Sequence, residues 1–293
     1  MDITPQDGGR PRIGAVVTGF DASRADASEV AAVRAAVHEH RIAVLRDQHL
    51  TPDEFLALGE LFGDPVTYYQ PMYHHPDRPE VFVSSNVPGD GSRVGVPKTG
   101  QFWHADYQFM AEPFALTLVY PRVVPARNRG TLFIDMAAAY RSLDAALRDE
   151  LRGVRARHSA NRYFKIRPSD VYRPIRDLIE EVDRETPPVV QPAVLTHPVT
   201  GEEVLYISQG CTIGFADQAG APLSGDLLAR VLDAVGQADT TGTHENVHLQ
   251  TFAEGDLLIW DNRTLVHRAR HTATPEPAVS WRVTVMDGER YYR

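Results

Sequence analysis

The sequence predicts a mainly β protein with flanking helices, arranged as a sandwich or a jelly-roll barrel. From about residue 81 onward, short stretches rich in β-branched and aromatic residues recur, and Pro and Gly separate them. Helical patterns interrupt these stretches at a few places only, without the regular strand–helix alternation of a doubly wound sheet. The length of 293 residues and the hydrophobic fraction of 43% suit one large domain, so we expect residues 1–293 to form a single domain.

The N-terminal part of the chain predicts two helices around one buried strand. Apolar residues at helical spacing predict the first helix over about 26–40, and the apolar run 42–45 predicts the strand. Thr51 stands three residues before Glu54, with a proline between them at the first helical position. This is the pattern of a capping box, and it predicts a second helix that ends at Gly63.

The rest of the chain predicts strands with three further helical stretches and one long insertion. The expected helices lie near 137–150, 170–183 and 223–236. The polar, Arg-rich stretch 155–188, which contains four prolines, is interpreted as an insertion able to cover a site. The expected strands are 81–84, 114–120, 131–134, 189–195, 204–207, 247–252, 257–260, 265–267 and 281–286.

Composition excludes several classes of partner. Lys and Arg total 30 against 39 Asp and Glu, and the resulting charge of −9 disfavours binding to nucleic acid. The single cysteine, Cys211, lies in an apolar neighbourhood and is interpreted as a core residue in a reducing compartment. We find neither an apolar leader at the N-terminus nor a stretch long enough to cross a membrane, so we expect a cytoplasmic protein. Assembly into a homo-oligomer stays open.

The first candidate for chemistry is the sequence His104-Ala105-Asp106. In an extended segment the side chains of residues i and i+2 point to the same side, so an imidazole and a carboxylate converge. A His-x-Asp pair alone is weak, because it occurs often by chance. His267, which a second apolar strand delivers after the polar turn that follows Trp260, adds a third ligand. Two His and one carboxylate form the facial triad of non-haem iron(II) oxygenases and leave coordination positions open.

Arg282 follows His267 by fifteen residues on an expected strand. Trp281 and Val283 occupy one face of that strand, and Arg282 occupies the other. An Arg on a strand is usually a solvated residue. In this order and spacing, however, we interpret it as a buried cation that grips a carboxylate through two hydrogen bonds.

These residues resemble the taurine dioxygenase superfamily of Fe(II)/2-oxoglutarate enzymes. The matching segments are VHEHRIAVLRDQHLTPDEFLALGELFGDP, FWHADYQF, GTLFIDMAAAY, WDNRTLVHRA and SWRVTV, in that order along nearly the whole chain. The resemblance implies a double-stranded β-helix, the cupin-like jelly roll, with Fe(II) bound by His104, Asp106 and His267. It implies 2-oxoglutarate and O2 as co-substrates, with Thr131 and Arg282 holding the distal carboxylate of 2-oxoglutarate. Met286 stands where taurine dioxygenase has a second Arg, which disfavours a taurine-like substrate.

A narrower resemblance is to the isonitrile-forming dioxygenases of isonitrile lipopeptide biosynthesis. It implies a small anionic substrate, a (3R)-3-[(carboxymethyl)amino] fatty acid that is oxidised and decarboxylated to the 3-isocyano acid. Tyrosines and cations would hold its carboxylates, and each taken alone is more simply a packing or solvated residue. The residues that this resemblance assigns to the substrate pocket are Tyr68, Tyr69, Tyr73, Lys165, Arg167, Arg129 and His271.

Two other hypotheses stay open at this point. One is a hydroxylase of the same superfamily that acts on another small carboxylic acid. The other is a non-catalytic β-barrel module with a degenerate metal site. The length of the acyl chain stays open, as does the choice between a free and a carrier-bound substrate.

Overall fold

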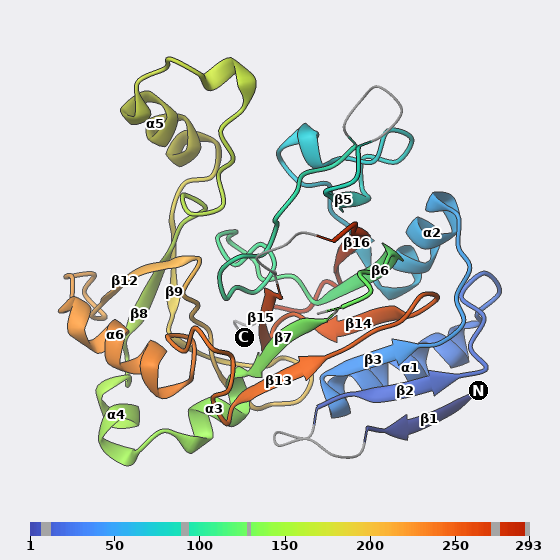
Figure 1. Ribbon diagram of the computed structural model, residues 1–293. Coiled ribbons are helices and arrows are strands. Elements are labelled where there is room, and N and C mark those ends of the chain that lie inside the picture. Colours follow the sequence, from blue (N-terminus) through green and yellow to red (C-terminus); the bar gives the residue numbers. More distant parts are fainter. Residues whose placement is uncertain (7–12, 89–93, 128–129, 271–275, 291–293) are drawn as a thin grey trace.

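The computed structural model describes residues 1–6, 13–88, 94–127, 130–270 and 276–290. Within these residues it has six α-helices, sixteen strands and two short 3-10 turns (Figure 1). The helices are α1 (Ala27–His40), α2 (Pro52–Phe62), α3 (Met136–Ser142), α4 (Ala145–Glu150), α5 (Ile175–Glu185) and α6 (Gly225–Ala234), and the 3-10 turns are η1 (Pro71–Tyr73) and η2 (Pro168–Asp170).

The strands form one large sheet and three small ones. The large sheet has the order β1-β2-β3-β14-β6-β16-β4, with β5 paired to β16, and β2–β3 is its one parallel pair among the described strands. Its strands are β1 (Asp2–Pro5), β2 (Ala15–Thr18), β3 (Ile42–Leu45), β4 (Asp64–Pro65), β5 (Phe82–Ser85), β6 (Leu116–Val123), β14 (Leu257–Asp261) and β16 (Val279–Met286). The small sheets contain β7 (Thr131–Asp135), β13 (Val247–Gln250) and β15 (Leu265–Ala269); β8 (Arg155–His158), β9 (Val189–Pro192) and β12 (Thr212–Ala216); and β10 (Val194–Thr196) and β11 (Glu203–Leu205).

The large sheet is buried on both faces because its central strands alternate between two cores. Leu257 and Ile259 of β14 pack toward α1 and α2, in the same cluster as Phe55 of α2. Their neighbours Leu258 and Trp260 belong to a second cluster on the opposite face. Successive side chains of a strand point to opposite faces, so one apolar strand serves both layers.

The second cluster lies between the large sheet and the sheet β13-β7-β15. Phe133 of β7 packs edge-on against Trp260, with 5.3 Å between their ring centroids. His267 of β15 contacts the same indole, at 4.9 Å between centroids, so it points into the space between the two sheets. Residues that alternate with these, such as Ile134 and Val266, belong to a third cluster on the outer side. The described strands form two facing sheets and do not close into a barrel.

The remaining elements lie beside this core (Figure 1). The sheet β12-β8-β9 carries α6, and the chain between β8 and β9 forms a long arm that ends in α5, at the top left of the view. The stretch 155–188 therefore begins with a strand of this small sheet, and only the part after His158 leaves it. No helix in the described residues is long and apolar enough to cross a bilayer.

Most expected elements are present, with shifted bounds. The capping box of α2 is confirmed, since the Thr51 side chain accepts from the Glu54 amide and the Glu54 carboxylate accepts from the Thr51 amide. The single helix expected over 137–150 is wrong, because Leu143 interrupts it and Asp144 caps a new helix, α4. The expected strand 189–195 is two strands, β9 and β10. The strands β1, β2, β4, β8 and β12 were missed. Of these, β4 has only two residues, β8 has two arginines and a histidine among its four residues, and β12 contains a glycine.

Candidate metal and 2-oxoglutarate site

His104, Asp106 and His267 meet in the space between the two facing sheets. One possible ligand atom of each lies within 4.8 Å of the other two, and all three residues are buried. The Nε2 atom of His104 is 3.8 Å from one carboxylate oxygen of Asp106, and that of His267 is 3.9 Å from the other. The structure thus brings together the two segments that the sequence separates by more than 150 residues.

Main-chain pairing holds the two histidines together. The segment at His104 forms an antiparallel bridge to β15, in which the amide of each histidine donates to the carbonyl of the other. The distances are 3.0 Å for the His104 amide and 2.7 Å for the His267 amide. The Nδ1 atom of His104 is 2.9 Å from the Phe102 carbonyl. A carbonyl only accepts, so Nδ1 carries the proton and Nε2 keeps its lone pair.

The electrostatics of the three groups fit a divalent metal ion. Burial lowers the pKa of His104 and lowers that of His267 well below its ordinary value, so both imidazoles are neutral at neutral pH. Burial raises the pKa of Asp106, but the positive charge of Arg282, with the hydrogen bond from Thr117, outweighs this and lowers it. Two neutral imidazoles and one carboxylate are the ligand set that suits Fe(II) with open positions. The residues present therefore fit the metal.

Asp106 is fixed by more bonds than either histidine. Its main chain is bonded twice to the Asn262 side chain: the Asp106 amide donates to Oδ1 at 2.8 Å, and Nδ2 donates to the Asp106 carbonyl at 3.0 Å. Its carboxylate accepts from the Thr117 hydroxyl at 2.9 Å. Arg282 of β16 forms an ion pair with the same carboxylate, and its guanidinium lies 4.0 Å from the centroid of the Phe82 ring.

Two cavities adjoin this group. His104 and Arg282 line both of them, so the predicted ligands stand at the boundary. One cavity has a volume of about 620 Å3 including its open mouth, and the other about 1050 Å3. Thr131, which the resemblance assigns to 2-oxoglutarate, lines the larger cavity together with His267.

The smaller cavity gathers part of the predicted substrate set. Tyr68, Tyr73 and Lys165 line it, and Lys98 stands in the same wall. Burial and the neighbouring Lys98 lower the pKa of Lys165. A cavity with two lysines on its wall attracts an anion, since each carboxylate that enters reduces the repulsion between them.

Two other predicted substrate residues, Tyr69 and Arg167, are placed differently. Tyr69 packs on the Tyr68 ring, at 4.7 Å between centroids, and is not among the described residues that line the smaller cavity. Arg167 forms ion pairs with Asp170 at 2.9 Å and Glu181 at 2.5 Å, and neither cavity has it in the lining described here. Arg129 and His271 lie outside the described residues. The roles of all these residues stay predictions.

Sequence reasoning missed Tyr163, which comes from the arm. Its hydroxyl donates to the Phe102 carbonyl at 2.9 Å, the same atom that accepts from His104, and its ring is 4.9 Å from the imidazole of His104. Gly210 makes room for it, because a Cβ there would lie 2.6 Å from the Tyr163 hydroxyl oxygen. The one available signal was the position of Tyr163 two residues before Lys165, on the same side of an extended segment.

Known proteins of one family are similar to this chain in sequence. The family "Taurine catabolism dioxygenase TauD, TfdA family" matches residues 2–284. Pentalenolactone F synthase of Streptomyces arenae is 31% identical over 276 residues, which cover 91% of this chain and 89% of the relative. The alpha-ketoglutarate-dependent 2,4-dichlorophenoxyacetate dioxygenase of Cupriavidus pinatubonensis is 30% identical over 256 residues, 83% of each chain.

Solved structures show the same fold. A taurine dioxygenase from Burkholderia xenovorans superposes with a TM-score of 0.71 at 24% identity, covering 98% of this chain and 89% of that chain. AAD-2 in complex with Mn(II) and N-oxalylglycine gives 0.74 at 23% identity, covering 99% and 100%. The described part of this chain therefore has the fold of these dioxygenases, whose core is a jelly roll.

The chain belongs to the TauD/TfdA family of 2-oxoglutarate-dependent dioxygenases. It is an oxidoreductase of the kind that uses Fe(II), 2-oxoglutarate and O2, and its His-His-Asp group agrees with that use. The hypothesis of a non-catalytic metal-binding module is therefore wrong. Neither of the two relatives named above is an isonitrile-forming enzyme, so the isonitrile-forming reaction stays a prediction.

Proposed function

We propose that His104, Asp106 and His267 hold the iron and that Arg282 and Thr131 hold the far carboxylate of 2-oxoglutarate in the larger cavity. Bound iron, 2-oxoglutarate and O2 supply a two-electron oxidation for each 2-oxoglutarate converted to succinate and CO2. Arg282 pairs with Asp106 in the structure as described. With Asp106 bound to a metal ion, the Arg282 guanidinium would be free to bind the carboxylate of the co-substrate, which offers two oxygens to its planar fork.

We further propose that the substrate is a (3R)-3-[(carboxymethyl)amino] fatty acid, converted to the 3-isocyano acid. The observation that supports this most directly is Lys165, half-buried in the wall of the smaller cavity beside Tyr68 and Tyr73. A lysine and two phenols suit a carboxylate, which the ammonium neutralises and the hydroxyls bind as donors. Held there, the carboxymethyl group would present its methylene toward the metal ligands His104 and Asp106 in the same cavity.

The names of two relatives support the same chemical unit. One relative is named for 2,4-dichlorophenoxyacetate and another, at 29% identity over 293 residues, for (S)-phenoxypropionate. Each of those acids carries its carboxylate on a carbon that is bonded to an ether oxygen. The proposed substrate has the same arrangement with an amine nitrogen in place of the oxygen.

An electron count fixes the stoichiometry of the proposed reaction. Loss of the carboxylate of R–NH–CH2–COO⁻ as CO2, with uptake of one proton, corresponds formally to R–NH–CH3, from which four hydrogens must be removed to leave R–NC. That is a four-electron oxidation. Each 2-oxoglutarate with one O2 accounts for two electrons, so the reaction consumes two of each and yields two succinates, two waters and three CO2 for each isonitrile.

The test measures succinate and isonitrile in the same incubation. Apo protein is supplied with Fe(II), 2-oxoglutarate and the (3R)-3-[(carboxymethyl)amino] acid, and the isonitrile is trapped with a tetrazine. We expect two succinates for each isonitrile. Succinate with a hydroxylated acid and no trapped isonitrile would reject this substrate assignment and favour the alternative, a hydroxylase of the same family that acts on another small carboxylic acid.

A further inference from the structure

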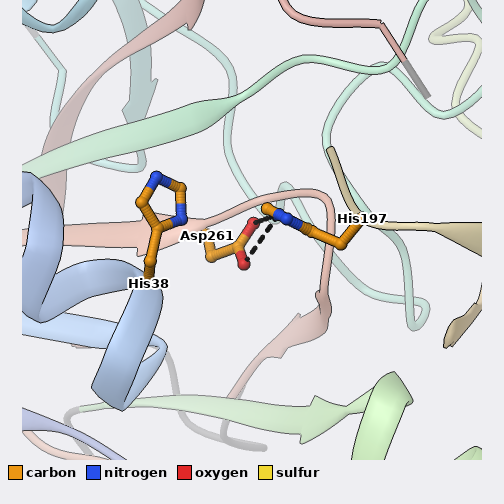
Figure 2. A group of neighbouring side chains, drawn as sticks. All are labelled: His38, His197 and Asp261. Carbon is orange, nitrogen blue, oxygen red and sulfur yellow. Dashed lines mark hydrogen bonds and ion pairs between the residues drawn. The ribbon is translucent and has the colours of Figure 1, made fainter. Parts of the chain in front are cut away.

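A second group of two histidines and one aspartate lies outside the candidate site. His38 of α1, Asp261 at the end of β14 and His197, in the loop after β10, also bring one ligand atom each within 4.8 Å of the others (Figure 2). Figure 2 shows the His197 ring directed at the carboxylate, while His38 approaches from the helix without a bond to either. This group has the same residue types as the candidate metal site, and its hydrogen bonds decide whether it is also suited to bind a metal ion.

The hydrogen bonds of His197 argue against a metal ion there. Its Nδ1 accepts from the amides of Val199 and Thr200, each at 3.1 Å. An imidazole nitrogen that accepts two amides carries no proton, so in the neutral ring the proton is on Nε2. That nitrogen faces Asp261 at 3.3 to 3.4 Å and therefore donates to it, leaving no lone pair for a cation.

The carboxylate of Asp261 is also fully engaged. It accepts from the Arg263 amide at 3.0 Å, from the Thr264 amide at 3.3 Å and from the Thr264 hydroxyl at 2.6 Å, in addition to His197. Both Asp261 and His197 have fully buried side chains. Burial raises the pKa of Asp261, but the hydrogen bonds from His197 and Thr264 outweigh it and lower the pKa. The hydrogen bonds of Asp261 thus hold the turn that joins β14 to β15 in place.

The residue at the tip of this turn reaches the candidate metal site. Asn262 follows Asp261 directly, and its amide donates to the Ala115 carbonyl at 3.0 Å. Its side chain makes the two bonds to the Asp106 main chain described above, at 2.8 and 3.0 Å. Asn262 is fully buried, so no water competes for these bonds. The turn then continues into β15, which delivers His267.

We infer that His197 and Asp261 anchor the β14–β15 turn, and that Asn262 uses this anchored turn to position Asp106 through its main chain. This inference rests on the proposed role of Asp106 as an iron ligand. Asn262 is a positioning residue, because its side chain bonds the Asp106 main chain and not the carboxylate, and it thereby restricts the direction in which the carboxylate leaves the backbone. Partners that orient metal ligands typically change metal affinity about 10–100-fold when they are removed.

Mn(II) binding to apo protein tests the inference without relying on turnover. Asn262→Ser loses the bond to the Asp106 carbonyl, and we expect its Kd for Mn(II) to rise about 10–100-fold. Thr264→Val removes the hydroxyl bond to Asp261 without changing the shape of the side chain, and we expect a rise of several-fold. Thr264→Ser keeps the hydroxyl and should restore the native Kd. A merely structural role would lower the melting temperature of the apo protein without this pattern in Kd.

Three outcomes would overturn the inference, and each is distinguishable from failure of the metal site. An unchanged Kd in folded Asn262→Ser would do so, as would equal values for Thr264→Val and Thr264→Ser should the Asn262 variant not fold. Native protein that binds two Mn(II) ions, with His38→Gln binding one, would show that the group in Figure 2 is a metal site. Native affinity in His104→Ala would instead reject the proposed iron site.

Discussion

The described residues contain two groups of the same composition, and of these one is suited to bind a metal. His104, Asp106 and His267 offer at least one imidazole lone pair and a carboxylate to a shared centre, beside two cavities. In the other group His197 donates its remaining proton to Asp261, whose oxygens are satisfied by the turn that they hold. Proximity of ligand residues is therefore not sufficient. Metal binding depends on the hydrogen bonds of the two ring nitrogens. In His104 one nitrogen donates to a carbonyl, so the other keeps its lone pair; in His197 one nitrogen accepts from two amides, so the other carries the proton.

The largest expected effect comes from removing one histidine of each group. His267→Ala should weaken Mn(II) binding more than about 100-fold, because a ligand is lost rather than a residue that orients one. The matched change His38→Ala should leave Mn(II) binding unaltered, since this residue has no part in the first group. Calorimetric titration of both apo variants checks this. Equal losses of affinity in the two variants would erase the distinction between the groups.

The two cavities beside the first group allow a sharper division. Arg282→Gln should raise KM for 2-oxoglutarate about 30-fold or more, while Lys165→Ala should raise KM for the amino acid substrate and leave that for 2-oxoglutarate nearly unchanged. The reason is that the carboxylate of 2-oxoglutarate loses its cation in the Arg282 variant, whereas the carboxylate of the substrate loses its cation in the Lys165 variant. Steady-state assays with each ligand varied in turn measure this, and parallel effects on both ligands would contradict the assignment of the cavities.

Arg167→Ala belongs to the same series. If Arg167 binds substrate, as the resemblance implies, its loss should act on KM as Lys165→Ala does. If its ion pairs with Asp170 and Glu181 define its role, the loss should lower the stability of the arm and leave KM near the native value.

The smallest expected effect concerns a buried histidine with neither a carboxylate nor a metal site. Burial lowers the pKa of His158 to about 3, and its Nδ1 contacts only the Thr212 hydroxyl, at 3.2 Å, among the described residues. Between about pH 6.5, the ordinary pKa of histidine, and about pH 3, His158 is protonated in the unfolded chain but neutral in the native state. The free energy of unfolding therefore falls as the pH is lowered through this range. Relative to His158→Gln, the native protein should lose about 2 kcal/mol of unfolding free energy from pH 7 to pH 5.

Urea unfolding at the two pH values measures this difference. The His158→Gln variant is the control, because its glutamine keeps an acceptor for Thr212 and does not titrate between the two pH values. Identical pH profiles for the two proteins would show that His158 is protonated in the native state, contrary to its burial.

Local spacing was enough for several parts of the fold and site. Alternation along a strand placed His104 beside Asp106 and set Arg282 on the face opposite Val283, and the structure agrees. The capping residues of α2 predicted where that helix begins. These features depend on residues within a few positions of one another, and their geometry follows from the backbone period alone.

Only the tertiary structure decided which histidines share a centre, and that His104 keeps the lone pair of Nε2 for it. The pairing of His104 with β15, the two hydrogen bonds between the Asn262 side chain and the Asp106 main chain, and the ion pair of Arg167 with Glu181 all join segments that no local pattern specifies. The two His-Asp-His groups cannot be told apart from residue types, because hydrogen-bond partners brought by folding compete for the same lone pairs. That competition, rather than composition, determines where this chain can hold a metal ion.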